Sequence, residues 1–171
     1  MPDNTSSFAG LVTRNKRQSY MNTGTVNAPS WSLIGEGFTS LAESKNPNEY
    51  SRHYVHEATE RTDVTGYAPS IAYALDVYSD DPCIQKIIEI TDKEEVGAAA
   101  QVDVVNVNLF EPVANATDTY KAYKRTYAVV PGNVGEGTDA LNYTGTFKAV
   151  GDAAPGQFAI ANGAGTFTAD T

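Results

Sequence analysis

Hydrophobic and polar residues alternate along much of the sequence, which is the pattern of β-strands. Between Ser70 and Tyr78, every second residue is large and apolar, so one face of this segment is expected to be buried. Residues 49–57 alternate too, but both of their faces carry polar side chains, and we expect this segment to pair with 71–78 as a hairpin. Similar patterns predict further strands at residues 31–34, 102–110, 120–130, 141–150 and 157–167.

One segment has the period of an amphipathic helix instead. Ile84, Ile87 and Ile88 fall at positions i, i+3 and i+4, while charged residues occupy the other face. The preceding Asp80-Asp81-Pro82 supplies a capping aspartate and a proline at the first helical position. We therefore predict a helix over about 80–95 that lies on a sheet and stops before Gly97.

The predicted elements indicate a mainly β protein, a β-sandwich or barrel with one flanking α-helix. A length of 171 residues suits one domain, which we place at residues 31–171. Residues 1–30 contain only scattered apolar side chains, with three basic residues against one acidic residue. This segment is predicted to be an extended N-terminal arm.

Composition narrows the function further. The formal net charge is −9, which disfavours adhesion to nucleic acid, because such binding needs an excess of Lys and Arg to neutralise phosphates. The single cysteine, Cys83, excludes an internal disulfide framework. No apolar run approaches the roughly 18 residues of a membrane span, so no membrane partner is expected.

Few residues are candidates for chemistry. His53 and His56 lie three apart on a predicted strand and would point to opposite faces, which disfavours a shared metal ion. Cys83, near a helix N-terminus, could be a nucleophile, but a small buried apolar residue is the favoured interpretation. Gly132, Gly135 and Gly137 do not form the dinucleotide-binding motif and indicate a flexible hairpin tip.

One basic and aromatic cluster could form a platform for single-stranded nucleic acid: Lys124 and Arg125 beside Tyr120, Tyr123 and Tyr127. Two basic residues give this hypothesis weak support in so acidic a chain. No catalytic arrangement, phosphate loop or metal cluster stands out. The sequence therefore predicts no enzyme, with no catalytic, cofactor-binding or metal-binding residues and no cofactor.

The order of several short motifs is more informative than any one of them. In sequence they are Trp31-x-x-Ile34-Gly35-x-Gly37-x-Thr39-Ser40-Leu41, Asn46-Pro47, Asp63-Val64-x-Gly66-Tyr67-x-Pro69-Ser70, Asp76-x-Tyr78, Asp81-Pro82, Tyr120-x-Ala122-x-Lys124-Arg125-x-Tyr127-Ala128-Val129, Ala140-Leu141-Asn142-Tyr143-x-Gly145 and Phe147-Lys148-Ala149-Val150-Gly151. This series resembles the tail tube (major tail) proteins of tailed bacteriophages and related prophages, particularly those of Gram-positive bacteria. The resemblance covers about residues 31–158.

This resemblance implies a structural virion protein that assembles into stacked hexameric rings. The rings form a tube that conducts double-stranded DNA into the host. It implies assembly in the bacterial cytoplasm, a final location in the virion tail, and partnership with tape-measure, tail terminator and tail-tip proteins. A net charge of −9 fits a conduit that DNA passes without adhering.

The resemblance also suggests which segments contact neighbouring rings, namely the arm at 1–30 and a long connection at 36–49. The candidate contact residues are Arg14, Lys16, Arg17, Phe38 and Leu41. Three acidic residues near a predicted hairpin end, Glu57, Glu60 and Asp63, are candidates for the lumen or its rim.

The alternative is a stand-alone β-sandwich module that binds carbohydrate, with Trp31 and several tyrosines as a stacking platform. Against it, a place for Trp31 and Tyr73 in the core or in subunit contacts is the favoured interpretation. A small hydrolase that uses Cys83 is the third and weakest interpretation.

Overall fold

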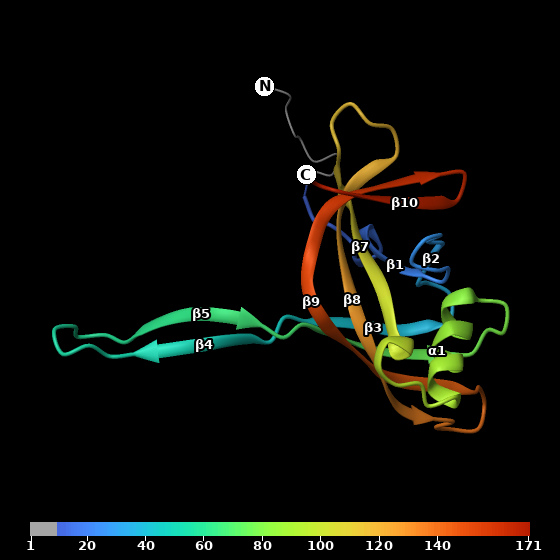
Figure 1. Cartoon of the computed structure of the whole chain (residues 1–171), viewed down its shortest axis with the longest axis horizontal. Helices are drawn as coiled ribbons and strands as arrows, with labels where there is room; N and C mark the ends of the chain where they lie inside the picture. Colours follow the sequence, from blue (N-terminus) through green and yellow to red (C-terminus); the bar gives the residue numbers. More distant parts are fainter. Residues whose placement is uncertain (1–9) are drawn as a thin grey trace.

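Six strands close into a barrel in the computed structural model, which describes residues 10–171 (Figure 1). Around the barrel, each strand pairs with the next, and the pairing of β10 with both β2 and β9 closes the ring. In this order the strands are β10 (Ala164–Ala169), β2 (Trp31–Leu33), β1 (Arg17–Asn22), β7 (Gln101–Pro112), β8 (Thr119–Val134) and β9 (Asn142–Ala161).

Two more strands extend the sheet beyond the barrel. β6 (Ser70–Asp76) pairs with the first part of β9, and β3 (Phe38–Ser44) pairs with β6 and ends the sheet. β9 serves both parts because it is long and bends where its register against β8 shifts, near Gly151 at φ +82°. The sequence predicted a mainly β fold, a sandwich or barrel with one flanking helix; this is confirmed, and the structure is a barrel.

The barrel interior is filled by side chains from all six strands. Phe158 of β9 is fully buried at its centre, with its ring 4.6 Å from that of Tyr20. Trp31 packs edge-on against Phe158, at 6.3 Å and 79° between the rings. Trp31 is therefore a core contact and does not form an exposed platform for carbohydrate. The remaining interior side chains are Val105, Val107, Leu109, Tyr120, Ala122, Ile160 and Phe167.

A second core lies beneath α1 (Pro82–Asp92), on the outer face of β1, β7, β8 and β9 and on one face of β6. Ile84, Ile87 and Ile90 of the helix are buried there. On β7, Val104 belongs to this second core and the adjacent Val105 to the barrel interior. β7 is consequently buried on both faces, and its residues 104–108 form a continuous buried run that includes Asn106 and Asn108.

The helix starts as its sequence predicts. The side chain of Asp81 accepts hydrogen bonds from the backbone N–H groups of Cys83 (2.8 Å) and Ile84 (3.1 Å), and Pro82 takes the first helical position. The helix ends earlier than expected, with Lys93 as its C-cap and Glu94 at φ +51°. Gly97 begins a short 3-10 helix, η2 (Gly97–Ala100), instead of stopping α1.

The prediction that residues 1–30 form an extended arm is wrong at β1 (Arg17–Asn22), which belongs to the barrel. η1 (Arg14–Lys16) leads into β1, whose Tyr20 and Met21 are buried in the two different cores. Because adjacent residues fill opposite faces, this strand lacks the alternation that would reveal it in the sequence. The part of the expected arm at residues 1–9 lies outside the described residues.

Two further expectations need correction. Residues 157–167 form parts of two strands, because Asn162 (φ +51°) and Gly163 (φ +77°) make a tight turn between β9 and β10. The long connection expected at 36–49 contains the edge strand β3.

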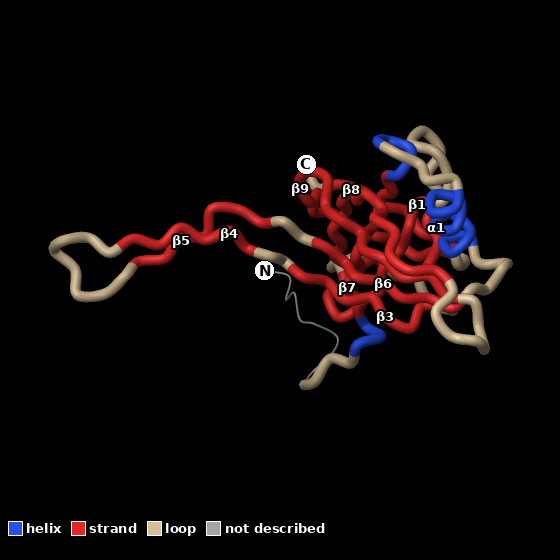
Figure 2. The backbone as a smooth tube through the Cα atoms, turned by 90° about the horizontal axis from the view of Figure 1, so that it is seen from below, coloured by secondary structure: helices blue, strands red, loops and turns tan. Residues whose placement is uncertain are grey.

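A two-stranded ribbon stands apart from the barrel (Figures 1 and 2). It consists of β4 (Pro47–Arg52) and β5 (Arg61–Tyr67), which in the described part of the chain pair only with each other. The hairpin predicted between residues 49–57 and 71–78 is therefore wrong, since β6 pairs with β3 and β9. Within residues 10–171, no helix has the length and apolar character needed to cross a membrane.

Candidate functional site

The β4–β5 ribbon is the most distinctive feature of the surface. Figure 2 shows it reaching far from the barrel, with its turn at the free end. Every residue of β4 and β5 except Gly66 is exposed. An isolated two-stranded ribbon in water is marginally stable at best, because it has no core of its own. The exposure of both strands favours packing of the ribbon against a partner surface.

Hydrogen bonds between the two chain segments fix the base of the ribbon. Asn46, at φ +44°, accepts from the backbone N–H of Ala68 (3.1 Å). Its side-chain amide donates to the Ala68 carbonyl (3.0 Å) and to the Ser70 hydroxyl (3.2 Å). The ribbon thus leaves the body from a defined point.

Both faces of the ribbon carry apolar and charged side chains. Tyr50 lies opposite Asp63 on one face, and the Arg52 guanidinium stacks over the Tyr50 ring at 5.3 Å. On the other face, Glu49 lies opposite Val64. Tyr50, Val64 and Tyr67 are all exposed, so the ribbon presents apolar surface to its surroundings.

The three acidic candidates for the lumen or rim all lie on this ribbon or its turn. Glu60 and Asp63 are exposed. Glu57 is 14% exposed and pairs with Arg61 and with His56, whose Nε2 lies 3.5 Å away. The structure thus places the three acidic residues together on the ribbon and its turn. Their position in a lumen stays a prediction.

His53 and His56 were predicted to lie on a strand and to point to its opposite faces. They lie instead in the turn that follows β4. His53 Nε2 lies 2.6 Å from the carbonyl oxygen of Glu57 and shapes the turn. Across residues 10–171, His, Cys, Asp and Glu side chains form no group of three that could hold a metal ion.

Four of the five predicted inter-ring residues line one groove. Arg14, Arg17, Phe38 and Leu41 surround a depression of about 410 Å³ between β1 and the edge strand β3. Arg14 donates to the Leu41 carbonyl across it, at 3.3 Å. Lys16 belongs to η1 but does not line the groove. The groove is a candidate contact surface, and its role between rings stays a prediction.

The proposed nucleic-acid platform does not form. Arg125 lies opposite Val104 and Lys124 opposite Val105, so the two basic side chains leave opposite faces of β8. Tyr127, on the Arg125 face, is buried. The aromatic and basic groups are therefore divided between two surfaces.

Cys83 is a core residue. Its thiol is fully buried and donates to the Ser32 carbonyl at 3.4 Å. Burial, together with the nearby Asp81 carboxylate, raises the pKa of Cys83 to about 12. A thiolate is thus scarce near neutral pH, and the hydrolase interpretation loses its nucleophile.

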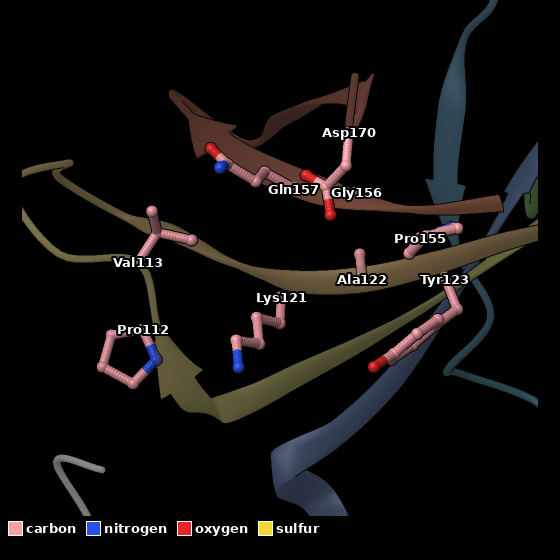
Figure 3. A pocket seen from close by; sticks show the side chains of 9 residues that line it. All are labelled: Pro112, Val113, Lys121, Ala122, Tyr123, Pro155, Gly156, Gln157 and Asp170. Atoms are coloured by element: carbon pink, nitrogen blue, oxygen red, sulfur yellow. The ribbon is translucent and has the colours of Figure 1, made fainter. Parts of the chain in front are cut away.

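A shallow cavity of about 320 Å³ lies among β7, β8 and β9 (Figure 3). Its charged residues are Lys121 and Asp170, and Figure 3 shows that these two side chains do not point toward each other. The cavity presents no convergent set of polar groups.

The polar character of residues 49–57 is evident in the sequence, but the ribbon was not predicted from it. The available signal was its pair of boundaries, Asn46-Pro47 and the Thr65–Pro69 turn sequence, which bracket two short segments with no apolar face.

No family model and no curated protein matches this sequence. Among solved structures, the chain is similar to a chain of the "cryo-EM structure of the anti-feeding prophage (AFP) baseplate, 6-fold symmetrised". The two share 11% sequence identity and a TM-score of 0.47, over 87% of this chain and 96% of the other.

Proposed function

We propose that this protein is a structural component of a phage tail. In this proposal it self-assembles into stacked hexameric rings that form the tail tube, an acidic conduit for double-stranded DNA. The β4–β5 ribbon is the observation that carries the proposal, because it projects from the body with both faces exposed and has no core of its own. A second copy would cover these faces in an assembly.

The sequence supports the same function independently. The ordered motifs that resemble tail tube proteins span the barrel, the helix and the ribbon. The net charge of −9, repeated in each subunit, would repel phosphates from the wall of the tube.

Other parts of the proposal follow from the resemblance. The protein acts as a structural element and not as an enzyme. Its partners are copies of itself together with tape-measure, tail terminator and tail-tip proteins. It is assembled in the host cytoplasm and resides in the virion tail.

Electron microscopy and sedimentation of two proteins test the proposal. One is the full chain, and the other replaces residues 47–67 with a two-residue Asn-Gly turn between Asn46 and Ala68. This deletion removes no side chain of either core. We expect rings or tubes from the full chain and a folded monomer from the variant. The far-ultraviolet circular dichroism of the variant should show that the strands outside the ribbon are still folded.

Equal assembly of both proteins would contradict the role of the ribbon. A full chain that stays monomeric at millimolar concentration, fails to join tubes seeded by a tail initiator, and binds glycans would instead support the carbohydrate-binding alternative.

A further inference from the structure

A second cavity, of about 280 Å³, lies at the polar end of the sheet face that carries the helix-covered core. On β7, that face changes from the apolar Val102 and Val104 to the buried Asn106. The cavity lies beside Asn106, where the apolar packing ends. Its lining residues are Arg17, Glu43, Lys45, Asn106, Tyr123, Arg125, Tyr127 and Ala153.

The charge of this cavity is opposite to that of the whole chain. Its lining contains three basic residues and one acidic residue, which leaves a net charge of +2 in a protein of net −9. The single carboxylate is already engaged, because Glu43 pairs with Arg17 through one oxygen (2.9 Å) and with Lys45 through the other. The third cation, Arg125, forms no ion pair with any of the described residues.

Arg125 also has an unused donor inside the protein. Its Nε is buried and has no hydrogen-bond partner among residues 10–171. Leaving such a charged donor without a partner is costly, and buried polar groups are normally paired. A guanidinium presents its N–H groups in a planar fork that matches the two oxygens of a carboxylate.

The surroundings add neutral donors. The Tyr127 hydroxyl is a neutral donor near pH 7, because the ordinary pKa of tyrosine already lies far above neutral, and burial with the nearby Glu43 raises the pKa of Tyr127 further. The amide of Asn106 and the ring of Tyr123 complete the lining. A group that enters this cavity thus meets donors and positive charge in partly dehydrated surroundings, where charge-assisted hydrogen bonds are strong.

We propose that this cavity is a carboxylate-binding site, in which the Arg125 guanidinium binds the carboxylate beside Arg17, Lys45 and Asn106. Two sources share this chemistry. One is a small free carboxylate, and the other is an Asp or Glu side chain of a second copy, since the chain carries 21 acidic residues. The inference goes beyond the tail-tube function, because all the residues that line the cavity belong to one subunit.

Nuclear magnetic resonance of the full chain distinguishes the sources. In the first arm, dilute protein is titrated with sodium acetate, with sodium chloride at the same ionic strength as reference. We expect saturable shifts of the Arg125 Nε–H and Asn106 side-chain amide signals with acetate only if the site takes a free carboxylate. In the second arm, protein concentration is raised without acetate, and the same shifts report a carboxylate from another copy.

Three variants accompany both arms. Arg125→Gln should weaken the response of the Asn106 amide at least tenfold, and Arg125→Lys should weaken it less, because it keeps the charge but loses the fork. Lys148→Gln removes the same charge at an exposed position of β9 outside the cavity and should leave the response unchanged. The proposal is overturned if acetate and chloride act alike and protein concentration has no effect, or if Arg125→Gln and Lys148→Gln respond equally.

Discussion

The guanidinium of Arg17 and the carboxylate of Glu43 meet at 2.9 Å across strands that are not neighbours in the sheet. Arg17 lies on β1 in the barrel, and Glu43 lies on β3 at the far end of the sheet. Arg17 also donates to the Asn108 side chain on β7, at 2.6 Å. These contacts hold the edge strand β3 over the second core.

Replacing Glu43 with glutamine should therefore lower stability in a pH-dependent way. Burial raises the pKa of Glu43, but hydrogen bonds from Lys45 and Arg17 outweigh it and bring the pKa below its usual value. The stabilisation is present above the ordinary carboxyl pKa and is lost as pH falls through the folded-state pKa. Because the pair is partly exposed, Glu43→Gln should cost about 1 kcal/mol at pH 7 and less at pH 3.

Urea unfolding at both pH values measures this difference. Glu36→Gln, at an exposed position of the loop before β3, is the matched control and should cost little at either pH. An equal loss for Glu43→Gln at pH 7 and pH 3 would show that the ion pair is not its cause.

Alkaline conditions should destabilise the protein through Cys83. Its folded pKa of about 12 lies above the ordinary thiol value, so the folded state retains a proton that the unfolded state releases. The contribution of Cys83 to stability should be constant up to about pH 8 and fall as pH rises toward 12. Cys83→Ala should be less stable at pH 8, by about 1–2 kcal/mol, but should lose less between pH 8 and pH 10.5.

Guanidinium unfolding at these two pH values, together with thiol labelling of the native protein at pH 8, tests this expectation. The native thiol should react far more slowly than in denaturant. Tyr73, whose pKa burial also raises to about 12, keeps a residual alkaline slope in the variant. Parallel pH profiles for the two proteins would contradict the role of Cys83.

Gly165 should tolerate no side chain. A Cβ atom at this position would lie 2.0 Å from Cζ of Phe158, which is fully buried and has no room to move. Gly165→Ala should lower the free energy of unfolding by about 1–3 kcal/mol because the barrel interior becomes overpacked.

Gly66→Ala on the ribbon is the control for that substitution. Its Cβ would meet only the Asn48 side-chain nitrogen, at 3.7 Å, so stability should change by less than about 0.5 kcal/mol. Thermal unfolding of both variants provides the comparison, and a Gly165→Ala protein as stable as Gly66→Ala would refute the packing argument.

Charged substitutions on the ribbon should separate folding from assembly. Val64→Lys and Tyr67→Lys change exposed side chains, so the unfolding free energy of the subunit should stay within about 0.5 kcal/mol. If a second copy covers this surface, the concentration needed for assembly should rise at least tenfold in sedimentation experiments. Val96→Lys, at an exposed position next to α1, should assemble normally. Unimpaired assembly of the ribbon variants would place the contact elsewhere.

Local sequence signals predicted the helix and most strands because their causes are local. The Asp81-Pro82 cap and the spacing of Ile84 and Ile87 place the helix start and its buried face, and both are observed. The alternation around Ile71 and Tyr73 likewise gives the buried face of β6. Each depends on contacts within a few residues or on one buried face.

The misplaced elements depend on distant partners. β1 carries Tyr20 and Met21 into different cores, and neither core can be inferred from six residues. The edge strand β3 is held by β6 and by Arg17, and its sequence has no continuous apolar face. Strand pairing across such separations is set by packing and not by local preference.

The sequence by itself determined a mainly β domain with one capped helix and a formal net charge of −9. The tertiary structure decided which strands close the barrel and that residues 47–67 form a free ribbon. It also gathered Arg14, Arg17, Phe38 and Leu41 around one groove and left Arg125 Nε without a hydrogen-bond partner among residues 10–171. Local sequence patterns indicate whether a residue is buried. Its neighbours depend on which distant segments pack into the same core.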